Sequence, residues 1–269
     1  MAEGIKKRVT TAVVLVAVLL AVVLWLPPRG TQAALTLVVL AGAWEWSAFL
    51  RIQSVVVRVL YVLLIGAVMW GAWDFTAAPA GLDLVLRVAV VWWLIALGWV
   101  MFAPRLVSSW AAAIAGVLAL VPAWVALNRL LDFNRGTEWV LFALILVGVA
   151  DIGAFFVGRR FGRTRLAPNV SPGKTWEGVI GGAVASALVA VLGSAWFNVP
   201  VARFVPLCLA VVAFSIVGDL TESLLKRFAG VKDSGSLFPG HGGVMDRIDS
   251  VTGAAPILFF GLVALGVHP

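Results

Sequence analysis

The chain has 269 residues, of which 62% are hydrophobic and 12% charged, and its formal net charge is +7. A soluble domain contains roughly 45–50% apolar and about 25% charged residues, so this composition excludes a soluble enzyme, a disordered chain and a disulfide-stabilised scaffold. The one cysteine, Cys208, lies in an apolar segment, and we interpret it as a packing residue. The composition predicts an all-α, polytopic integral membrane protein, and no nucleic-acid partner is needed to explain its positive charge.

Nine apolar segments are candidates for membrane-spanning helices, which need roughly 17–25 residues each. They cover residues 9–26, 32–50, 55–73, 84–102, 110–127, 138–157, 178–197, 200–217 and 252–267. Only two residues separate the seventh segment from the eighth, which predicts a tight helical hairpin. The first segment is long for a signal peptide, and the prolines that follow it offer no small-residue cleavage site, so we expect a retained helix.

The positions of Lys and Arg predict the orientation of these spans. If the N-terminus is cytoplasmic, alternate connections place fifteen of the 20 Lys and Arg residues inside. The five that fall outside are Arg29, Arg87, Arg129, Arg135 and Arg203. Cytoplasmic connections carry the excess of positive residues, so we predict a cytoplasmic N-terminus and, with nine spans, an external C-terminus.

Two connections are long and polar, residues 158–177 and 218–251, and both fall on the predicted cytoplasmic side. Glu45 and Asp151 lie inside predicted spans near that side, while Asp219 and Asp249 lie at the ends of spans. Ionisable groups within a membrane are costly and therefore indicate function. Glu45 has an equally weighted alternative, a structural partner for an arginine or for backbone N–H groups.

The second polar connection starts with a pattern typical of one helix face. If residues 218–228 are helical, then Asp219, Glu222, Ser223 and Lys226 fall at i, i+3, i+4 and i+7. A solvated surface could show the same pattern. This face, however, leads into further basic residues and a glycine-rich turn.

The same connection ends with Asp246 and Asp249 at i, i+3 on a predicted helix start, with Arg247 between them. Carboxylates beside lysines and arginines are what a metal–polyphosphate site requires, because carboxylate oxygens bind Mg²⁺ and bases neutralise phosphate. The preceding residues 238–243 contain three glycines, which allow backbone N–H groups to approach an anion. A turn without any binding role could have the same sequence. His241 has no nearby second histidine, which disfavours a zinc site.

The first polar connection returns to the membrane through residues 171–178. Ser171 could cap a helix there, with Pro172 in its first turn. Lys174 near a helix start is unexpected from the helix dipole unless it has an anionic partner or ligand. Along the following span, small residues recur at every fourth position, and we interpret them as packing inside the bundle in preference to a dimer interface. These residues are Gly178, Gly182, Ser186, Ala190 and Ser194.

The residues of the second connection resemble the signature of the phosphatidate cytidylyltransferases, also called CDP-diacylglycerol synthases. The signature reads Ser-Leu-Leu-Lys-Arg from Ser223, Lys-Asp-Ser-Gly from Lys232, and Leu-Phe-Pro-Gly-His-Gly-Gly-Val-Met-Asp-Arg-Ile-Asp up to Asp249. Residues 151–162 and 171–178 also look like that family. The N-terminal half resembles it only as a hydrophobic region. We therefore divide the chain into N-terminal transmembrane helices, 1–136, and a catalytic transmembrane region, 137–269.

The resemblance implies that CTP and phosphatidate react, with Mg²⁺, to give CDP-diacylglycerol and pyrophosphate. It also implies an all-helical inner-membrane protein, often a homodimer. Phosphatidate would enter sideways from the cytoplasmic leaflet, and CTP from the cytoplasm. The attacking nucleophile would be an ionised phosphate oxygen of the lipid, so the protein would only need to position the substrates and neutralise their charges.

The resemblance and the residue pattern together assign roles to particular side chains. The expected metal ligands are Asp219 and Asp246, followed by Asp249, Glu222 and Asp151. The residues expected to bind triphosphate or phosphatidate are Lys226, Arg227, Lys232 and Arg247, with Ser223, His241, Gly242, Gly243, Lys174 and Ser171 beside them. Of these, Asp219, Asp246, Lys226 and Arg247 are the expected catalytic residues.

Two other functions deserve comparison with this one. An ion-coupled secondary transporter would use buried acids as an ion path, but it predicts charges spread over the depth of the membrane. A CDP-alcohol phosphotransferase would carry a run of aspartates with Asp-Gly and Ala-Arg pairs, which this sequence lacks. The cytidylyltransferase reading is therefore preferred.

Overall fold

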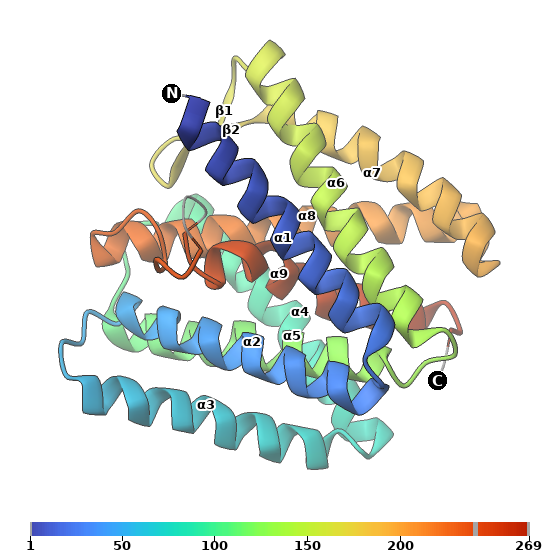
Figure 1. Ribbon diagram of the computed structural model, residues 1–269, viewed down its shortest axis with the longest axis horizontal. Helices are drawn as coiled ribbons and strands as arrows, with labels where there is room; N and C mark the ends of the chain where they lie inside the picture. The colour runs from blue at the N-terminus through green and yellow to red at the C-terminus, as the bar shows by residue number, and fades with distance from the viewer. Residues whose placement is uncertain (1, 239–241, 268–269) are drawn as a thin grey trace.

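The computed structural model describes residues 2–238 and 242–267, with side chains described from residue 10 onward except at residue 12. These residues form nine helices and one short hairpin, shown in Figure 1. The helices are α1 Ala2–Trp25, α2 Pro28–Phe49, α3 Val55–Phe75, α4 Pro79–Phe102, α5 Ser109–Leu130, α6 Gly136–Phe161, α7 Trp176–Phe197, α8 Val201–Ala229 and α9 Met245–Ala264. The strands are β1 Arg165–Ala167 and β2 Ser171–Thr175.

The predicted all-α membrane fold is confirmed. In the described part of the chain, seven helices, α3 to α9, are long and apolar enough to cross a membrane. The described side chains of α1 add the shorter apolar stretch Val13–Trp25, and α2 carries the buried carboxylate of Glu45. Each of the nine predicted segments therefore corresponds to a helix.

Helix boundaries follow recognisable end signals in the sequence. Proline occupies the first turn of α2 and of α4, where its missing N–H group costs nothing. Ser108 caps α5 by accepting a hydrogen bond from the Ala111 N–H group at 3.1 Å. At the other end of its helix, Asn198 ends α7 in the left-handed conformation, with φ of 55°. The tight α7–α8 turn predicted from the sequence follows directly.

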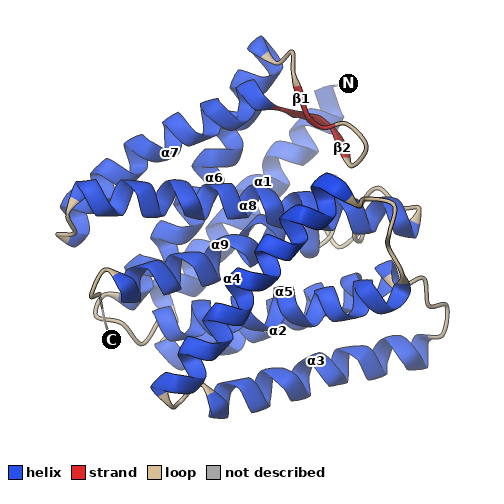
Figure 2. Cartoon of the chain, turned by 180° about the vertical axis from the view of Figure 1, so that it is seen from behind, coloured by secondary structure: helices blue, strands red, loops and turns tan. Residues whose placement is uncertain are grey.

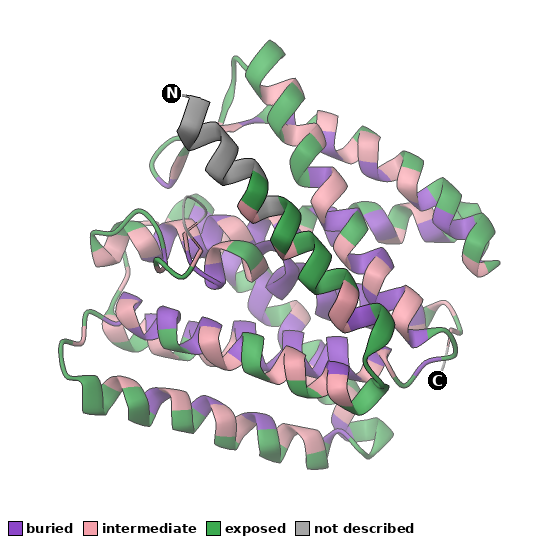
Figure 3. Ribbon diagram, in the orientation of Figure 1, coloured by how far each residue is buried: buried purple, intermediate pink, exposed green. Residues whose placement is uncertain are grey.

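The C-terminal helix α9 occupies the centre of the bundle. It packs against α8 and α5, and also against α2, α4 and α6. Figure 3 shows α9 and α5 largely buried, whereas α3 and the described side chains of α1 are mostly exposed. One core cluster is formed mainly by side chains of α5, α6, α8 and α9. A second is formed by side chains of α2, α3, α4 and α5 together with residues of α8 and α9. Because α9 contacts helices on both sides of residue 136, the proposed division into two regions stays a prediction.

Helices α6 and α7 approach each other closely through small residues. The five small residues predicted to pack inside the bundle are all buried, which confirms that interpretation. A Cβ atom on Gly182 would lie 2.7 Å from the Ala150 carbonyl oxygen, and one on Gly178 would lie 2.9 Å from the Ala154 carbonyl oxygen. Only glycine permits such an approach, so these residues fix the distance between the two helices.

Both polar connections are shorter than the sequence predicted. Helix α6 continues to residue 161, α8 continues to residue 229, and α9 begins at residue 245. The connections proper are therefore 162–175 and 230–244. The expectation that Ser171 caps a helix is wrong: residues 171–175 form β2, which pairs antiparallel with β1. Thr175 is the cap of α7 instead, and it accepts a hydrogen bond from the Gly178 N–H group at 3.2 Å.

The connections alternate between the two ends of the bundle. Figure 1 shows the start of α1, the hairpin and residues 230–238 and 242–244 of the second connection at the left, and the end of α9 at the right. Figure 2 shows the same hairpin from behind, above the end of α4. The two polar connections are thereby placed at one end of the molecule.

Candidate active site at the polar end of the bundle

Lys174 and Asp219 meet at the polar end of α8. Lys174 extends from β2, and its Nζ atom lies 2.6 Å from Oδ2 of Asp219. Ser223, one turn further along α8, donates a hydrogen bond to Oδ1 of Asp219 at 3.2 Å. The pair lines a cavity of about 590 Å³ between α6, the hairpin, α7 and α8, to which Asp151 also contributes. Lys174 thus has the anionic partner that its position at a helix start required.

Lys226 is held between two carboxylates. Its Nζ atom lies 2.5 Å from Oε2 of Glu222 and 2.8 Å from Oδ1 of Asp246. The Lys226 side chain is 12% exposed and the Glu222 side chain is fully buried. Burying these charges is tolerable because each has a partner of opposite sign. The predicted helical face of α8 is confirmed. Its carboxylates Asp219 and Glu222 pair with Lys174 of β2 and with Lys226, respectively.

Asp246 organises the 230–244 connection as well as pairing with Lys226. Its Oδ2 atom accepts hydrogen bonds from the Ser234 N–H group at 3.0 Å, the Ser234 hydroxyl at 2.9 Å and the Gly243 N–H group at 2.7 Å. The Ser234 hydroxyl oxygen in turn accepts from the Asp246 N–H group at 3.2 Å. The start of α9 and the middle of the connection are therefore tied together through one carboxylate.

Glu45 lies beneath this connection, although it comes from α2. Its Oε2 atom accepts a hydrogen bond from the Met245 N–H group at 2.8 Å and shares the one Ser234 hydroxyl proton, also at 2.8 Å, with Asp246. A Cβ atom on either Gly235 or Gly243 would collide with its carboxylate. The structural alternative for Glu45, a partner for backbone N–H groups, is therefore confirmed. The glycines of the connection are required because Glu45 fills the space below them.

The remaining carboxylates join the two lysine pairs into one charged cluster. Asp249 lies close enough to Asp219 and Glu222 to interact with both electrostatically. Asp151 likewise interacts with Asp219 and Lys174, and also with Arg247. These acids gather at one end of the bundle and are not spread across its depth, in contrast to the arrangement that the transporter alternative predicts.

The other predicted site residues lie around this cluster. Arg227 reaches the hairpin, where its Nε–H group points to the Val170 carbonyl oxygen at 3.4 Å. Lys232 is exposed in the connection, and Gly242 adopts a φ of +78°, which favours glycine. Ser171 pairs with Ala167 in the hairpin and is not among the described residues that line the polar cavity. His241 lies outside the described residues.

The carboxylates do not form a complete metal cage. Among the side chains that the structure describes, from residue 10 to 238 except residue 12 and from 242 to 267, no three Asp, Glu, His or Cys side chains converge so as to hold a metal ion. Mg²⁺ usually binds one or two carboxylates and completes its shell with water and substrate phosphates. The donor chemistry of the cluster therefore fits a Mg²⁺ ion that is held jointly with a phosphate ligand.

Comparison with known proteins decides the family. The cytidylyltransferase family profile matches residues 6–265. The chain belongs to this family. A phosphatidate cytidylyltransferase of Haemophilus influenzae is 38% identical over 95% of this chain and 98% of its own length. One of Pseudomonas aeruginosa is 39% identical over 97% of this chain and 98% of its own length. One of Synechocystis is 43% identical over 50% of this chain and 46% of its own length.

As a cytidylyltransferase, the chain is a nucleotidyltransferase enzyme, and it is embedded in a membrane by its apolar helices. Sequence reasoning missed two features of its site. Ser234 was noted only as part of a motif, although it bridges Glu45 and Asp246. Arg159 and Arg165 were counted only for orientation, yet both line the polar cavity. The available signal was their position: Arg159 lies inside the glycine-containing segment 151–162, and Arg165 lies between that segment and 171–178.

Proposed function

We propose that this cytidylyltransferase makes CDP-diacylglycerol and pyrophosphate from CTP and phosphatidate. A phosphate oxygen of the lipid forms a bond to the α-phosphorus of CTP. The bond between that phosphorus and the oxygen bridging to the β-phosphorus breaks, and the electron pair leaves with pyrophosphate. The observation that carries the proposal is the cluster of Lys174, Lys226 and five carboxylates in a membrane-embedded enzyme. Relatives that match nearly the whole chain bear the name phosphatidate cytidylyltransferase.

The reaction needs no general base. The second ionisation of a phosphate monoester has a pKa of about 6, so the lipid phosphate already carries its nucleophilic oxygen near neutral pH. The protein must position two anionic phosphates and offset their charges. Lys174 and Lys226 can exchange a carboxylate oxygen for a phosphate oxygen without leaving the site. Arg247, beside Asp151, and the arginines of the polar cavity supply further positive charge.

Asp219 and Asp246 are the proposed Mg²⁺ ligands, with Asp249, Glu222 and Asp151 next. When bound, Mg²⁺ would neutralise charge on the triphosphate and so assist the departure of pyrophosphate. Carboxylate oxygens are the ligands that Mg²⁺ prefers in proteins, and the gathering of these five acids supports a cation at this place. Asp219 is the better supported of the two, because Asp246 already accepts hydrogen bonds from Ser234 and Gly243.

The proposed setting is a bacterial inner membrane with the N-terminus and both polar connections in the cytoplasm. The bias of Lys and Arg toward that side supports this orientation, since positive residues accumulate in cytoplasmic connections. CTP would then reach the cavity from the cytoplasm, and phosphatidate from the adjacent leaflet. The homodimer implied by the family resemblance stays a prediction.

The first test measures CDP-diacylglycerol formed by the detergent-purified protein from phosphatidate, CTP and Mg²⁺. We expect product with the wild type and none with EDTA. Asp219→Asn should lower kcat by at least about 100-fold, the scale on which loss of a charge-stabilising group slows catalysis. Asp83→Asn is the matched control, because Asp83 is an exposed aspartate that pairs with Arg87 at the start of α4.

The outcomes separate the reaction from the site map. A folded wild type that forms no Mg²⁺-dependent product with any phosphatidate would overturn the reaction and direct attention to ion-flux assays. Wild-type activity in Asp219→Asn would keep the reaction but remove Asp219 from the site. An equal loss in Asp83→Asn would mean that the assay reports general damage to the protein.

A further inference from the structure

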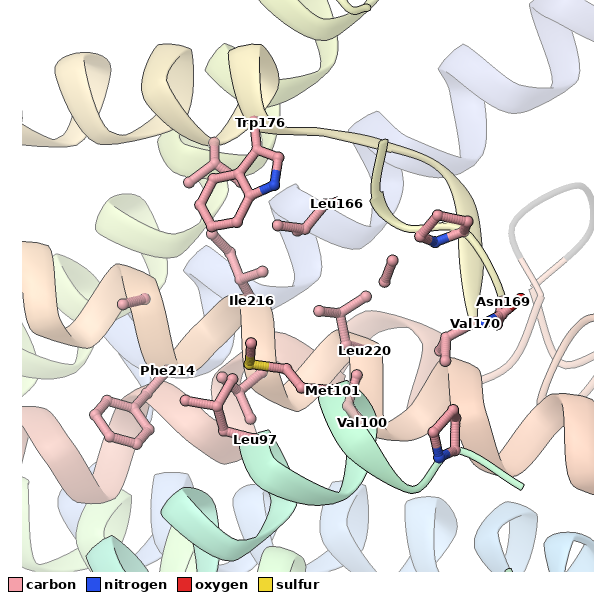
Figure 4. Close-up of a pocket in the computed structure, with 16 residues that line it drawn as sticks. Leu97, Val100, Met101, Leu166, Asn169, Val170, Trp176, Phe214, Ile216 and Leu220 are labelled. Atoms are coloured by element: carbon pink, nitrogen blue, oxygen red, sulfur yellow. The ribbon is translucent and has the colours of Figure 1, made fainter. Parts of the chain in front are cut away.

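A second, apolar cavity lies beside the polar one. It has a volume of about 350 Å³ and is enclosed by the end of α4, the hairpin, the start of α7 and the middle of α8. Figure 4 shows that side chains from all four elements point into it. Leu97 and Val100 come from α4, Leu166 from the hairpin, Trp176 from α7 and Leu220 from α8. This volume falls within the range of small-ligand pockets, about 300–1,000 Å³.

The lining of this cavity selects for an apolar ligand. Among the described residues that form it, none carries a charge, and Asn169 is the one amide side chain. A nucleotide or a free phosphate would find no basic side chain there. Burial of methylene groups is favourable by about 0.8 kcal/mol each, so a hydrocarbon chain would bind well. Met101 and Trp176 are more than half exposed, and they leave one side of the cavity open to the surroundings of the bundle.

The apolar cavity adjoins the proposed reaction site. Val179 of α7 and Ile216 of α8 line both cavities. Asp219 follows Ile216 by one helical turn, and it faces the polar cavity, where Lys174 holds it at 2.6 Å. A molecule with a phosphate at one end and a hydrocarbon chain at the other could therefore occupy both cavities at once.

We propose that the apolar cavity binds one acyl chain of the phosphatidate substrate while its phosphate lies in the polar cavity. The inference rests on the proposed function and adds the residues that would bind the acyl chain of the lipid. Phosphatidate joins a dianionic head to apolar chains, and this matches a charged cavity continuous with an uncharged one. The chain bound there positions the lipid phosphate, so cavity shape sets the preferred acyl length.

The test fills the cavity from one wall. Ala213 of α8 lines the cavity, so Ala213→Trp would occupy space meant for the chain. We measure kcat/KM with dioleoyl and with dihexanoyl phosphatidate, and compare their ratio with that of the wild type. The ratio should fall about tenfold or more, since excluding two methylene groups from an apolar site has this effect on affinity. Ala202→Trp is the matched control, because Ala202 is exposed in the first turn of the same helix and should leave the ratio unchanged.

A direct measurement covers the case in which Ala213→Trp does not fold. Phosphatidate with a photoactivatable diazirine in the middle of an acyl chain is crosslinked to the wild type, and labelled peptides are mapped by mass spectrometry. We expect label on α4 and α8 around Leu97, Met101 and Leu220, and competition by unlabelled phosphatidate. Phosphatidylcholine with the same diazirine should not label these residues above the rest of the surface.

Each outcome separates this inference from the proposed function. An unchanged dioleoyl-to-dihexanoyl ratio in folded Ala213→Trp would overturn the acyl site while the reaction stands. Equal labelling by phosphatidylcholine, or label confined to other helices, would also overturn it. If the wild type converts neither dioleoyl nor dihexanoyl phosphatidate, the proposed function itself is overturned, and the acyl site with it.

Discussion

Glu45 is a buried carboxylate that helps to position the candidate active site, although it is distant from the other site residues in the sequence. It lies in α2, yet its hydrogen-bond partners Ser234 and Met245 lie 189 and 200 residues away. The Met245 N–H group belongs to the first turn of α9, where a negative charge is favourable. Through Ser234, Glu45 also fixes the hydrogen bonds that reach Asp246. Besides the packing of α2 and α4 against α8 and α9, this one carboxylate therefore supports the candidate active site through hydrogen bonds.

Replacing Glu45 with leucine should damage both stability and activity. The buried Met245 N–H group would lose its acceptor, at a cost of about 1–3 kcal/mol, whereas the Ser234 hydroxyl would keep Asp246 as its acceptor. Loss of a residue that orients a metal or phosphate ligand typically lowers activity by about 10–100-fold. Thermal denaturation in detergent and the CDP-diacylglycerol assay would measure the two effects. Glu45→Gln should recover part of both, because its carbonyl oxygen can accept the same two hydrogen bonds.

Glu138→Leu is the matched control for this experiment. Glu138 pairs with Arg135 and Trp196 at the opposite end of the bundle, where its side chain is 38% exposed. An exposed ion pair contributes about 0–1 kcal/mol, so this variant should remain close to the wild type. If Glu45→Leu were as stable and active as Glu138→Leu, Glu45 would not position the site.

At the scale of elements, the sequence predicted the helices well because apolar length and helix-end residues are local properties. Each of the nine predicted apolar segments corresponds to a helix, and Pro28 and Asn198 mark ends that the sequence also predicted. The hairpin was missed because strands of 3 and 5 residues are too short to show a period. Ser171 therefore looked like a helix cap, although Thr175 is the cap.

The site was predictable only where its residues share a helix. The face of α8 follows from the helical repeat, so Asp219, Glu222 and Lys226 could be grouped without a structure. The pairing of Lys174 with Asp219 could not, because it depends on how the hairpin folds against α8. The role of Glu45 was equally hidden, since nothing in its surroundings along the chain indicates contact with α9.

The close contact between α6 and α7 leads to a prediction at this scale. Gly182→Ala would place a methyl group 2.7 Å from the Ala150 carbonyl oxygen and force the helices apart. We expect a cost of about 1–3 kcal/mol, as for other overpacked interiors, and reduced activity because both helices line the polar cavity. Gly148→Ala on α6 is the control, since a Cβ atom there meets nothing within 4 Å. Equal denaturation temperatures for the two variants would contradict the prediction.

At the scale of the whole molecule, the alternation of helices and the location of charge support the same orientation. The helices place the hairpin and the described residues of the second connection, 230–238 and 242–244, at the same end as the start of α1, as Figure 1 shows. Helix α8 is 29 residues long, about 43 Å at 1.5 Å per residue, so it extends beyond a hydrocarbon core of about 30 Å. Its last turns, which carry Lys226 and Arg227, can therefore reach the aqueous side while its first turns remain in the membrane.

Cysteine labelling in intact bacterial cells tests this orientation. Cys208 is fully buried, so Cys208→Ser should provide an unlabelled background at little cost. On that background we introduce Ser54→Cys between α2 and α3, and Asn134→Cys between α5 and α6; both positions are exposed, and both substitutions leave the distribution of Lys and Arg intact. A membrane-impermeant maleimide should label Asn134→Cys in intact cells and Ser54→Cys only after permeabilisation. The reverse pattern would place the charged cluster outside the cell, away from cytoplasmic CTP, and would contradict both the orientation and the proposed reaction.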